Sequence, residues 1–216
     1  MVEESFRHKG LRKKLVDSLR EKGITDPGVL KAMENVPRHL FLDSSFLEFA
    51  YQDKAFPIGS GQTISQPYTV AFQTQLLQVR PGEKILEIGT GSGYQSCVLI
   101  EMGAKVYTIE RQKKLFEKTR EFLPTLGYYP KMFYGDGYKG LPPFAPFDKA
   151  IITAAAPEIP REIIDQIKTG GILIIPLGPL EVQTMYTIRK VSETEIQRIE
   201  HKQFRFVPML GDKAKD

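Results

Sequence analysis

Three glycines on alternate positions directly after a short apolar run constrain this chain more than any other feature. The run is residues 85–88, Ile-Leu-Glu-Ile, and the glycines are Gly89, Gly91 and Gly93. Apolar residues continue over 97–100 as they would in a helix, so the segment predicts a strand, a tight turn and a helix. Glycine permits positive φ angles and leaves no Cβ between the backbone and a ligand. A helix that begins near residue 94 would direct its free N–H groups at that ligand.

The glycine spacing and a later carboxylate indicate which ligand the turn accepts. In the dinucleotide fingerprint G-x-G-x-x-G/A, counted from Gly89, the third position falls on the bulky Tyr94. A second apolar run, residues 106–109, ends in Glu110, where a carboxylate is placed to hold a ribose diol. No P-loop lysine follows the glycines, which disfavours a triphosphate. A glycine turn alone is sometimes only a tight connection, but together with Glu87 and Glu110 it predicts nucleoside binding.

Short apolar segments alternate with helical ones through the middle of the chain, which is typical of a parallel sheet buried on both faces. The predicted strands are residues 84–88, 104–109, 131–134, 148–153 and 172–175, with helices at 112–126 and 160–168. Residues 182–190 and 195–206 alternate polar and apolar without a helix between them, so we expect antiparallel additions. The predicted fold is α/β: a doubly wound, mostly parallel, seven-stranded Rossmann-like sheet, with ligands at the carboxyl ends of its parallel strands.

Two extra helices are predicted ahead of the first strand. Residues 5–22 have leucines at helical spacing and end at Gly23, and a second helix begins at Asp26-Pro27 and stops before Pro37. We expect both to form a cap or an added layer beside the sheet. Residues 53–61 contain one proline and two glycines and are predicted to be a loop.

The composition excludes several classes of protein. The chain is 41% hydrophobic and 26% charged, as in a soluble globular protein, and its net charge of +4 is too small to indicate nucleic acid. Cys97 is the single cysteine, lies in an apolar helix and is expected to be a buried thiol. Residues 1–14 are charged without an apolar core, and no run approaches transmembrane length. We therefore expect a cytoplasmic protein with no membrane and no nucleic-acid partner.

Ser65 stands immediately before a predicted helix whose first turn contains Pro67. Ser65 or Gln66 would then be the N-cap of that helix. Alternatively, the Ser65 hydroxyl and the free N–H groups behind it would form an anion site. From local sequence alone the capping role is favoured.

Four further stretches resemble the protein-L-isoaspartate O-methyltransferase family, within the class I S-adenosylmethionine-dependent methyltransferases. They are residues 62–68 (Gln-Thr-Ile-Ser-Gln-Pro-Tyr), 135–137 with 148–157, 170–178 and 206–209. The resemblance runs from about residue 38 to residue 210. Many methyltransferases share the glycine turn, whereas the Thr-Ile-Ser-x-Pro stretch is much more specific. With this resemblance, a substrate-site role for Ser65 alongside capping is favoured over capping alone.

The resemblance implies transfer of a methyl group from S-adenosylmethionine to the α-carboxylate of an L-isoaspartyl residue in a damaged protein or peptide. The other product is S-adenosylhomocysteine, and no metal is implied. By the same resemblance, Ser65 is the catalytic residue and contacts the substrate together with the main chain of Val207, Glu110 holds the ribose, and Asp136 and Gly137 meet the adenine edge. The family motif often has Asp where this chain has Glu87. The implied cofactor-binding residues are Thr63, Ile64, Ser65, Glu87, Gly89, Gly91, Gly93, Glu110, Asp136 and Gly137.

Because the resemblance covers nearly the whole chain, we expect a single methyltransferase domain over residues 1–216. Residues 1–80 would hold the N-terminal helices and the substrate-side segment, 81–178 the cofactor-binding core, and 179–216 the C-terminal strands and tail. We expect a monomer that binds damaged proteins through their backbone. The extended residues 204–209 would suit pairing with a peptide as an added strand, and an ordinary edge strand explains them equally well.

The implied chemistry asks little of the side chains. A carboxylate with a pKa near 4 is already ionised at neutral pH, so it needs no general base. In agreement, His8, His39 and His201 lie in no motif, and no set of metal ligands appears. The protein has to hold one carboxylate oxygen about 3 Å from the methyl carbon, in line with the leaving sulfur. We expect Ser65 to orient that carboxylate and not to be a nucleophile, because no motif supplies a histidine to activate it.

Three other functions share part of this pattern. A nucleic-acid amine methyltransferase would typically carry an Asn/Asp-Pro-Pro-aromatic stretch after the fourth strand, where residues 153–157 are Thr-Ala-Ala-Ala-Pro. A small-molecule O-methyltransferase acting on hydroxyls would need a base or a metal, and neither is evident. A module that only binds the cofactor shares the same sequence features and is separated from an enzyme by assay.

Overall fold

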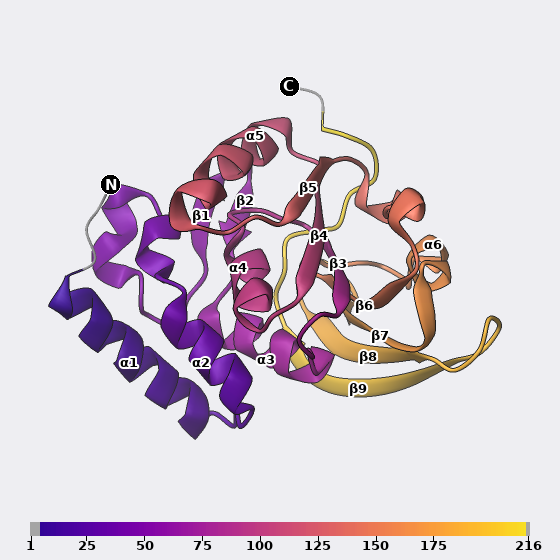
Figure 1. Cartoon of the computed structure of the whole chain (residues 1–216), viewed down its shortest axis with the longest axis horizontal. Coiled ribbons are helices and arrows are strands. Elements are labelled where there is room, and N and C mark those ends of the chain that lie inside the picture. The colour runs from indigo at the N-terminus through magenta and orange to yellow at the C-terminus, as the bar shows by residue number, and fades with distance from the viewer. Residues whose placement is uncertain (1–4, 215–216) are drawn as a thin grey trace.

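The computed structural model describes residues 5–214, which form a seven-stranded sheet with helices packed against it (Figure 1). Neighbouring strands are parallel from β5 to β7, and the last two strands run antiparallel to their neighbours. This confirms the predicted α/β class and places β9 at the sheet edge, beyond β8. In spatial order the strands are β5 (Lys131–Tyr134), β4 (Lys105–Glu110), β3 (Lys84–Ile88), β6 (Phe147–Ile152), β7 (Ile167–Leu177), β8 (Gln183–Lys190) and β9 (Ile196–Phe204).

The two N-terminal helices begin where their capping residues predict. Ser5 accepts a hydrogen bond from the His8 amide (3.2 Å), and Asp26 accepts one from the Gly28 amide (2.8 Å), so both expected N-terminal helices are confirmed. The α-helices are α1 (Phe6–Glu21), α2 (Pro27–Asn35), α3 (Pro67–Leu77), α4 (Tyr94–Glu101), α5 (Lys113–Phe122) and α6 (Arg161–Asp165). The 3₁₀ helices are η1 (Arg38–Phe41), η2 (Ser44–Phe49), η3 (Leu123–Leu126), η4 (Gly137–Lys139) and η5 (Pro142–Phe144).

The centre of the sheet consists of buried apolar side chains, and its strand order determines where a ligand can bind. Leu86 of β3, Ile151 of β6 and Ile174 of β7 are fully buried, and burial of each such side chain contributes about 2 kcal/mol. From β3 the chain moves to β4 on one side and later returns to β6 on the other. The order therefore reverses at β3, and the crevice of a doubly wound sheet lies at the carboxyl ends of the strands around such a point.

Helices α1 and α2 form an added layer, as predicted. Leu19 of α1 and Val29 of α2 are fully buried in the same apolar cluster as Val70 of α3 and Val98 of α4. Figure 1 shows α1 and α2 outside α3 and α4, at the end of the molecule away from β9.

One predicted loop is wrong: residues 53–61 lead into a β-hairpin. Strand β1 (Phe56–Gly59) pairs antiparallel with β2 (Gln62–Ile64), in a small sheet of its own. The glycines form its turn, and Phe56 is buried with its ring centroid 5.4 Å from that of Phe46. Pro57 is tolerated because this two-stranded sheet consists only of edges. The hairpin presents residues 62–65 to the carboxyl ends of the large sheet.

A second correction concerns residues 160–168, predicted as one helix. Helix α6 ends at Asp165, and Ile167 already belongs to β7, where it pairs with Phe147. The apolar residues Ile163, Ile164 and Ile167 fit a helical period, but Ile167 is buried against the neighbouring strand instead. The helix expected over 112–126 likewise continues only as η3 beyond Phe122, because Pro124 lacks a backbone N–H.

Candidate active site

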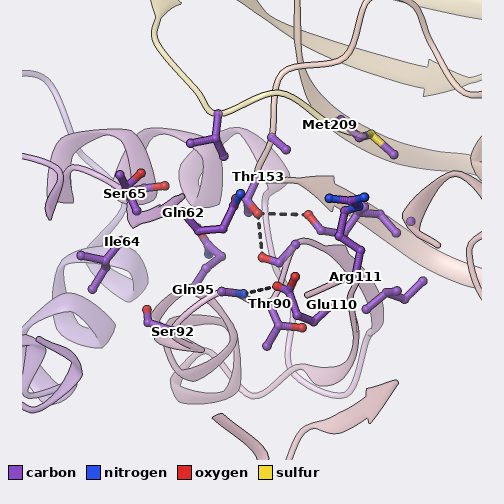
Figure 2. A pocket seen from close by; sticks show the side chains of 18 of the residues that line it. Gln62, Ile64, Ser65, Thr90, Ser92, Gln95, Glu110, Arg111, Thr153 and Met209 are labelled. Carbon is purple, nitrogen blue, oxygen red and sulfur yellow. Dashed lines mark hydrogen bonds between the residues drawn. The ribbon is translucent and has the colours of Figure 1, made fainter. Parts of the chain in front are cut away.

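The glycine turn after β3 has the geometry that its sequence requires. Gly89, Gly91 and Gly93 have φ angles of 97°, 53° and 83°, in the left-handed region that favours glycine. A Cβ on Gly89 would stand 2.5 Å from Oγ1 of Thr153. That hydroxyl lies 3.0 Å from the Ile88 carbonyl and 2.8 Å from the Gly89 carbonyl, as the dashed lines in Figure 2 show. The end of β6 thus holds the turn from the other side.

Glu110, the last residue of β4, holds the same turn through its carboxylate. Its two oxygens accept hydrogen bonds from the amides of Gly91 and Gln112, each 2.8 Å long. Figure 2 shows the bond from Gly91. Burial raises the pKa of Glu110, while these amides oppose the rise and favour the ionised form. Each oxygen keeps a further lone pair for a donor in the cavity, because a carboxylate oxygen can accept more than one hydrogen bond.

These residues line an open cavity of about 820 Å³ at the carboxyl ends of β3, β4 and β6 (Figure 2). The structure brings eight predicted site residues to its wall. Three come from the hairpin side, Thr63, Ile64 and Ser65; the other five are Gly89, Gly91, Glu110, Gly137 and Val207.

Three other predicted cofactor residues are not among those that line the cavity: Glu87, Gly93 and Asp136. Side chains alternate along a strand, and since Ile88 faces the cavity, Glu87 points to the opposite side of β3. A Cβ on Gly93 would stand 2.8 Å from Leu123, so this glycine permits helix packing. Asp136 accepts a hydrogen bond from the Tyr138 amide (2.9 Å) and caps η4.

Glu87 is a buried carboxyl group beneath the glycine turn. It is fully buried, its Oε2 accepts a hydrogen bond from the Ser96 hydroxyl, and its Oε1 has no partner among the described residues. Burial raises the pKa of Glu87 to about 7, and the nearby hydroxyls of Ser96 and Thr108 oppose that rise. Glu87 therefore lies beneath the cavity floor, and its ionisation there would lower the stability of the turn.

Ser65 does not cap the helix that follows it. Gln66 occupies the N-cap position without a side-chain hydrogen bond, and the Tyr68 amide donates instead to Oδ1 of Asp53 (2.8 Å). Of the two predicted N-caps, Gln66 takes the position and Ser65 does not, and the helix has no side-chain capping bond from either. One of the N–H groups expected in an anion site already has a carboxylate partner. Sequence reasoning missed Asp53 because it lies 15 residues from Tyr68 in a segment predicted to be a loop.

A second, wider hollow of about 1010 Å³ lies on the other side of Ser65, between the start of α3 and the end of β9. We call it the outer groove. Four residues line both the cavity and the outer groove: Thr63, Ser65, Thr153 and Val207. The two spaces thus adjoin at these four residues, Ser65 among them, and a group bound in one can reach a group bound in the other there.

Residues 207–214, the C-terminal strap, cross the mouth of the cavity. The Val207 carbonyl accepts from the Ala155 amide (2.8 Å), and the Met209 amide donates to the Ala155 carbonyl (2.7 Å). Farther on, Arg111 donates through Nε to the Asp212 carbonyl (3.1 Å) and through Nη2 to that of Gly211 (3.3 Å). Sequence reasoning missed Arg111, whose only signal was its place directly after Glu110.

The described part of the chain contains no group of three or more His, Cys, Asp or Glu side chains that could hold a metal ion. Over the same residues, no helix has the length and apolar character needed to cross a membrane.

Comparison with known proteins identifies the family. Residues 10–214 match the family described as Protein-L-isoaspartate(D-aspartate) O-methyltransferase. The chain is 59% identical to the protein-L-isoaspartate O-methyltransferase of Flavobacterium johnsoniae, with 98% of this chain and all of that protein covered. It is 58% identical to that of Cytophaga hutchinsonii, with 97% and 95% covered.

Solved structures agree with this result. A putative protein-L-isoaspartate O-methyltransferase from Plasmodium falciparum, in complex with S-adenosyl-L-homocysteine, superposes with a TM-score of 0.79 at 26% identity, covering 92% of this chain and 98% of that one. Another protein-L-isoaspartate O-methyltransferase superposes with a TM-score of 0.84 at 29% identity, covering 94% of this chain and 67% of that one. The predicted resemblance is confirmed: this chain belongs to the protein-L-isoaspartate(D-aspartate) O-methyltransferase family.

Proposed function

We propose that this protein is a repair methyltransferase that moves a methyl group from S-adenosylmethionine to the α-carboxylate of L-isoaspartyl residues in damaged proteins and peptides. Its family membership supports this reaction. The observation that carries the proposal is the meeting of two spaces at Ser65: a cavity built on bare glycine backbone and an outer groove open to a polymer. Methyl transfer between a nucleoside-linked donor and a peptide requires such a junction.

The residues of the cavity suit S-adenosylmethionine. Gly89 and Gly91 expose backbone to the ligand, and the Glu110 carboxylate offers lone pairs to the ribose hydroxyls. In this proposal Gly137 lies at the adenine edge. The position requires glycine, because a Cβ there would stand 2.4 Å from Cγ2 of Ile88 and crowd the cavity wall. Thr63, Ile64 and Ser65 border the remaining side. Glu87, Gly93 and Asp136 support the site from behind its lining and take no direct contact with the cofactor in this proposal.

The chemistry needs orientation and little else from the chain. The bound cofactor supplies a methyl group on a positively charged sulfonium. The isoaspartyl carboxylate is ionised at neutral pH and needs no base. Ser65 donates its hydroxyl hydrogen to that carboxylate and fixes the angle of approach. None of the cavity-lining residues is a histidine; the Nε2 of His201, for example, lies 2.9 Å from the Thr187 hydroxyl.

Binding of the peptide through the backbone is a narrower proposal than a full added strand. The Val207 carbonyl already accepts from the Ala155 amide, so Val207 has only its amide to offer as a donor. Substrate alignment in this proposal uses that single donor together with Ser65. We further propose a single domain, a monomer and a cytoplasmic location; the buried free thiol of Cys97 is compatible with a reducing compartment.

The test is methyl transfer from labelled S-adenosylmethionine to a pair of peptides that differ only in one isoaspartyl or aspartyl linkage. We expect labelling of the isoaspartyl peptide alone. A second measurement follows conversion of the labelled peptide to the normal linkage by chromatography. Equal labelling of the two peptides, or labelling of neither, contradicts the proposal.

A further inference from the structure

The charged side chains on the wall of the outer groove are positive only. Among the described residues that line it, Arg205 is the only one with a charged side chain. Arg205 is exposed and forms no ion pair with another described residue. The remaining wall is polar or aromatic, with Gln66, Gln203, Tyr68 and Phe204 as examples. An unpaired guanidinium on the wall of a binding groove favours a negatively charged partner.

Other positive groups close to the groove add to the positive potential that Arg205 creates there. The Lys202 ammonium donates to the Tyr68 hydroxyl (3.0 Å), and α3 directs its N-terminal end at the groove through Gln66 and Tyr68. The acidic residue near this end of the helix is Asp53, and it is bound to Lys22 at 2.5 Å and to the Tyr68 amide. Glu181, which precedes the lining residue Val182, is the other carboxylate close to the groove along the chain.

The position of Arg205 along the groove sets the part of a peptide that it can meet. Val207 lines the junction at Ser65, and Arg205 lies two residues before it. In extended backbone two residues span roughly 6.5 Å, and the side chains of such residues point to the same side. A guanidinium at this spacing reaches the side chain of a peptide residue about two positions from the one held at Ser65.

We propose that Arg205 is a specificity-determining residue that favours isoaspartyl sites flanked by an acidic side chain about two residues away. The inference rests on the proposed function, because it takes the peptide to lie in the outer groove with its isoaspartyl carboxylate at Ser65. Arg205 acts on substrate choice and not on the methyl transfer itself. Its effect is expected in kcat/KM, mainly through KM, and it weakens with added salt because the guanidinium is exposed.

The experiment uses three isoaspartyl peptides that are identical except for Glu, Gln or Lys placed two residues from the isoaspartyl residue on both sides. For the wild type we expect kcat/KM to be about threefold higher with Glu than with Gln and about tenfold higher than with Lys, at low salt. Arg205→Gln should remove the preference, and Arg205→Glu should reverse it. Arg198→Gln on β9, the strand that ends just before Arg205, changes an exposed arginine outside the groove lining; it serves as the matched control and should keep the wild-type order.

Binding of the same peptides, followed by fluorescence anisotropy with S-adenosylhomocysteine present, gives a readout that needs no turnover. If no peptide is methylated but Arg205 still controls which peptide binds, the reaction assigned to the protein fails and the charge preference stands. An equal loss for all three peptides in Arg205→Gln points to contact with main-chain carbonyls and overturns the inference. An unchanged order of the three peptides in Arg205→Gln overturns it as well.

Discussion

The floor and the roof of the cavity are built in different ways. The floor joins the ends of two consecutive strands, with backbone bonds from Gly89 and Thr90 to the Ile109 carbonyl (2.9 and 3.2 Å) and with Glu110 bound to the Gly91 amide. The roof combines Ser65 with the C-terminal strap, two segments far apart in sequence, and the strap is held at Ala155 and Arg111. In the proposed function, the cofactor is always the same molecule and binds to a local motif, whereas peptides of variable sequence bind to segments that only the tertiary structure brings together.

The largest effect is expected from a change in the floor. Gly89→Ala forces an alanine into a φ of 97° and places its Cβ 2.5 Å from Thr153 Oγ1. The strain and the displaced hydroxyl should weaken binding of S-adenosylhomocysteine about 1,000-fold, measured by titration calorimetry. Gly127→Ala is the matched control: its φ is 83°, nothing lies within 4 Å of the added Cβ, and cofactor affinity should be unchanged. Similar losses in both variants would show that the close contact with Thr153 is unimportant.

A change in the roof should separate turnover from cofactor binding. Ser65→Ala removes the hydroxyl at the junction of the two spaces, which in the proposed reaction orients the substrate carboxylate. We expect kcat on an isoaspartyl peptide to fall about 100-fold, with the dissociation constant of S-adenosylhomocysteine changed less than about twofold. Ser65→Thr, which keeps a hydroxyl, should recover part of the activity. An unchanged kcat in Ser65→Ala excludes the orienting role.

Ionisation of Glu87 should make the stability of the floor depend on pH. Burial raises the pKa of Glu87 to about 7 in the folded protein, so its protonated form favours folding; that contribution is full below pH 4.5 and is lost as pH rises through 7. Glu87→Gln mimics the protonated form and should be more stable than the wild type by about 2 to 3 kcal/mol at pH 8, with little difference at pH 5. Urea unfolding at both pH values measures this, and a difference that does not change with pH contradicts it.

The smallest effect is expected from the strap. Arg111→Ala removes the two hydrogen bonds to the carbonyls of Gly211 and Asp212 and leaves the contacts at Ala155 in place. Dissociation of S-adenosylhomocysteine should become about tenfold faster in stopped-flow experiments, because the strap opens more often. Arg120→Ala, on α5 and stacked on Phe116, should leave the rate unchanged. Equal rates for Arg111→Ala and the wild type would mean that the strap does not limit release.

Prediction from sequence worked where neighbouring residues determine the structure. The strand before Gly89, the helix that begins at Tyr94 and the carboxylate at Glu110 were all predicted, and the structure has them. The β1–β2 hairpin was missed, because Pro57 and the glycines outweighed the buried Phe56. Glu87 was grouped with the cavity residues because it adjoins the turn, although strand alternation turns its side chain away.

By itself, the sequence determined the class of fold, the glycine turn, the strands and most helices, since these follow from periodicity and from glycine conformations over a few residues. Only the tertiary structure decided that Asp53 binds the Tyr68 amide in place of Ser65, that the strap is held by Arg111, and that Arg205 faces the outer groove. The physical reason is range. Backbone propensity acts between neighbours, whereas these contacts depend on how distant segments pack and on which polar groups that packing leaves in need of a partner.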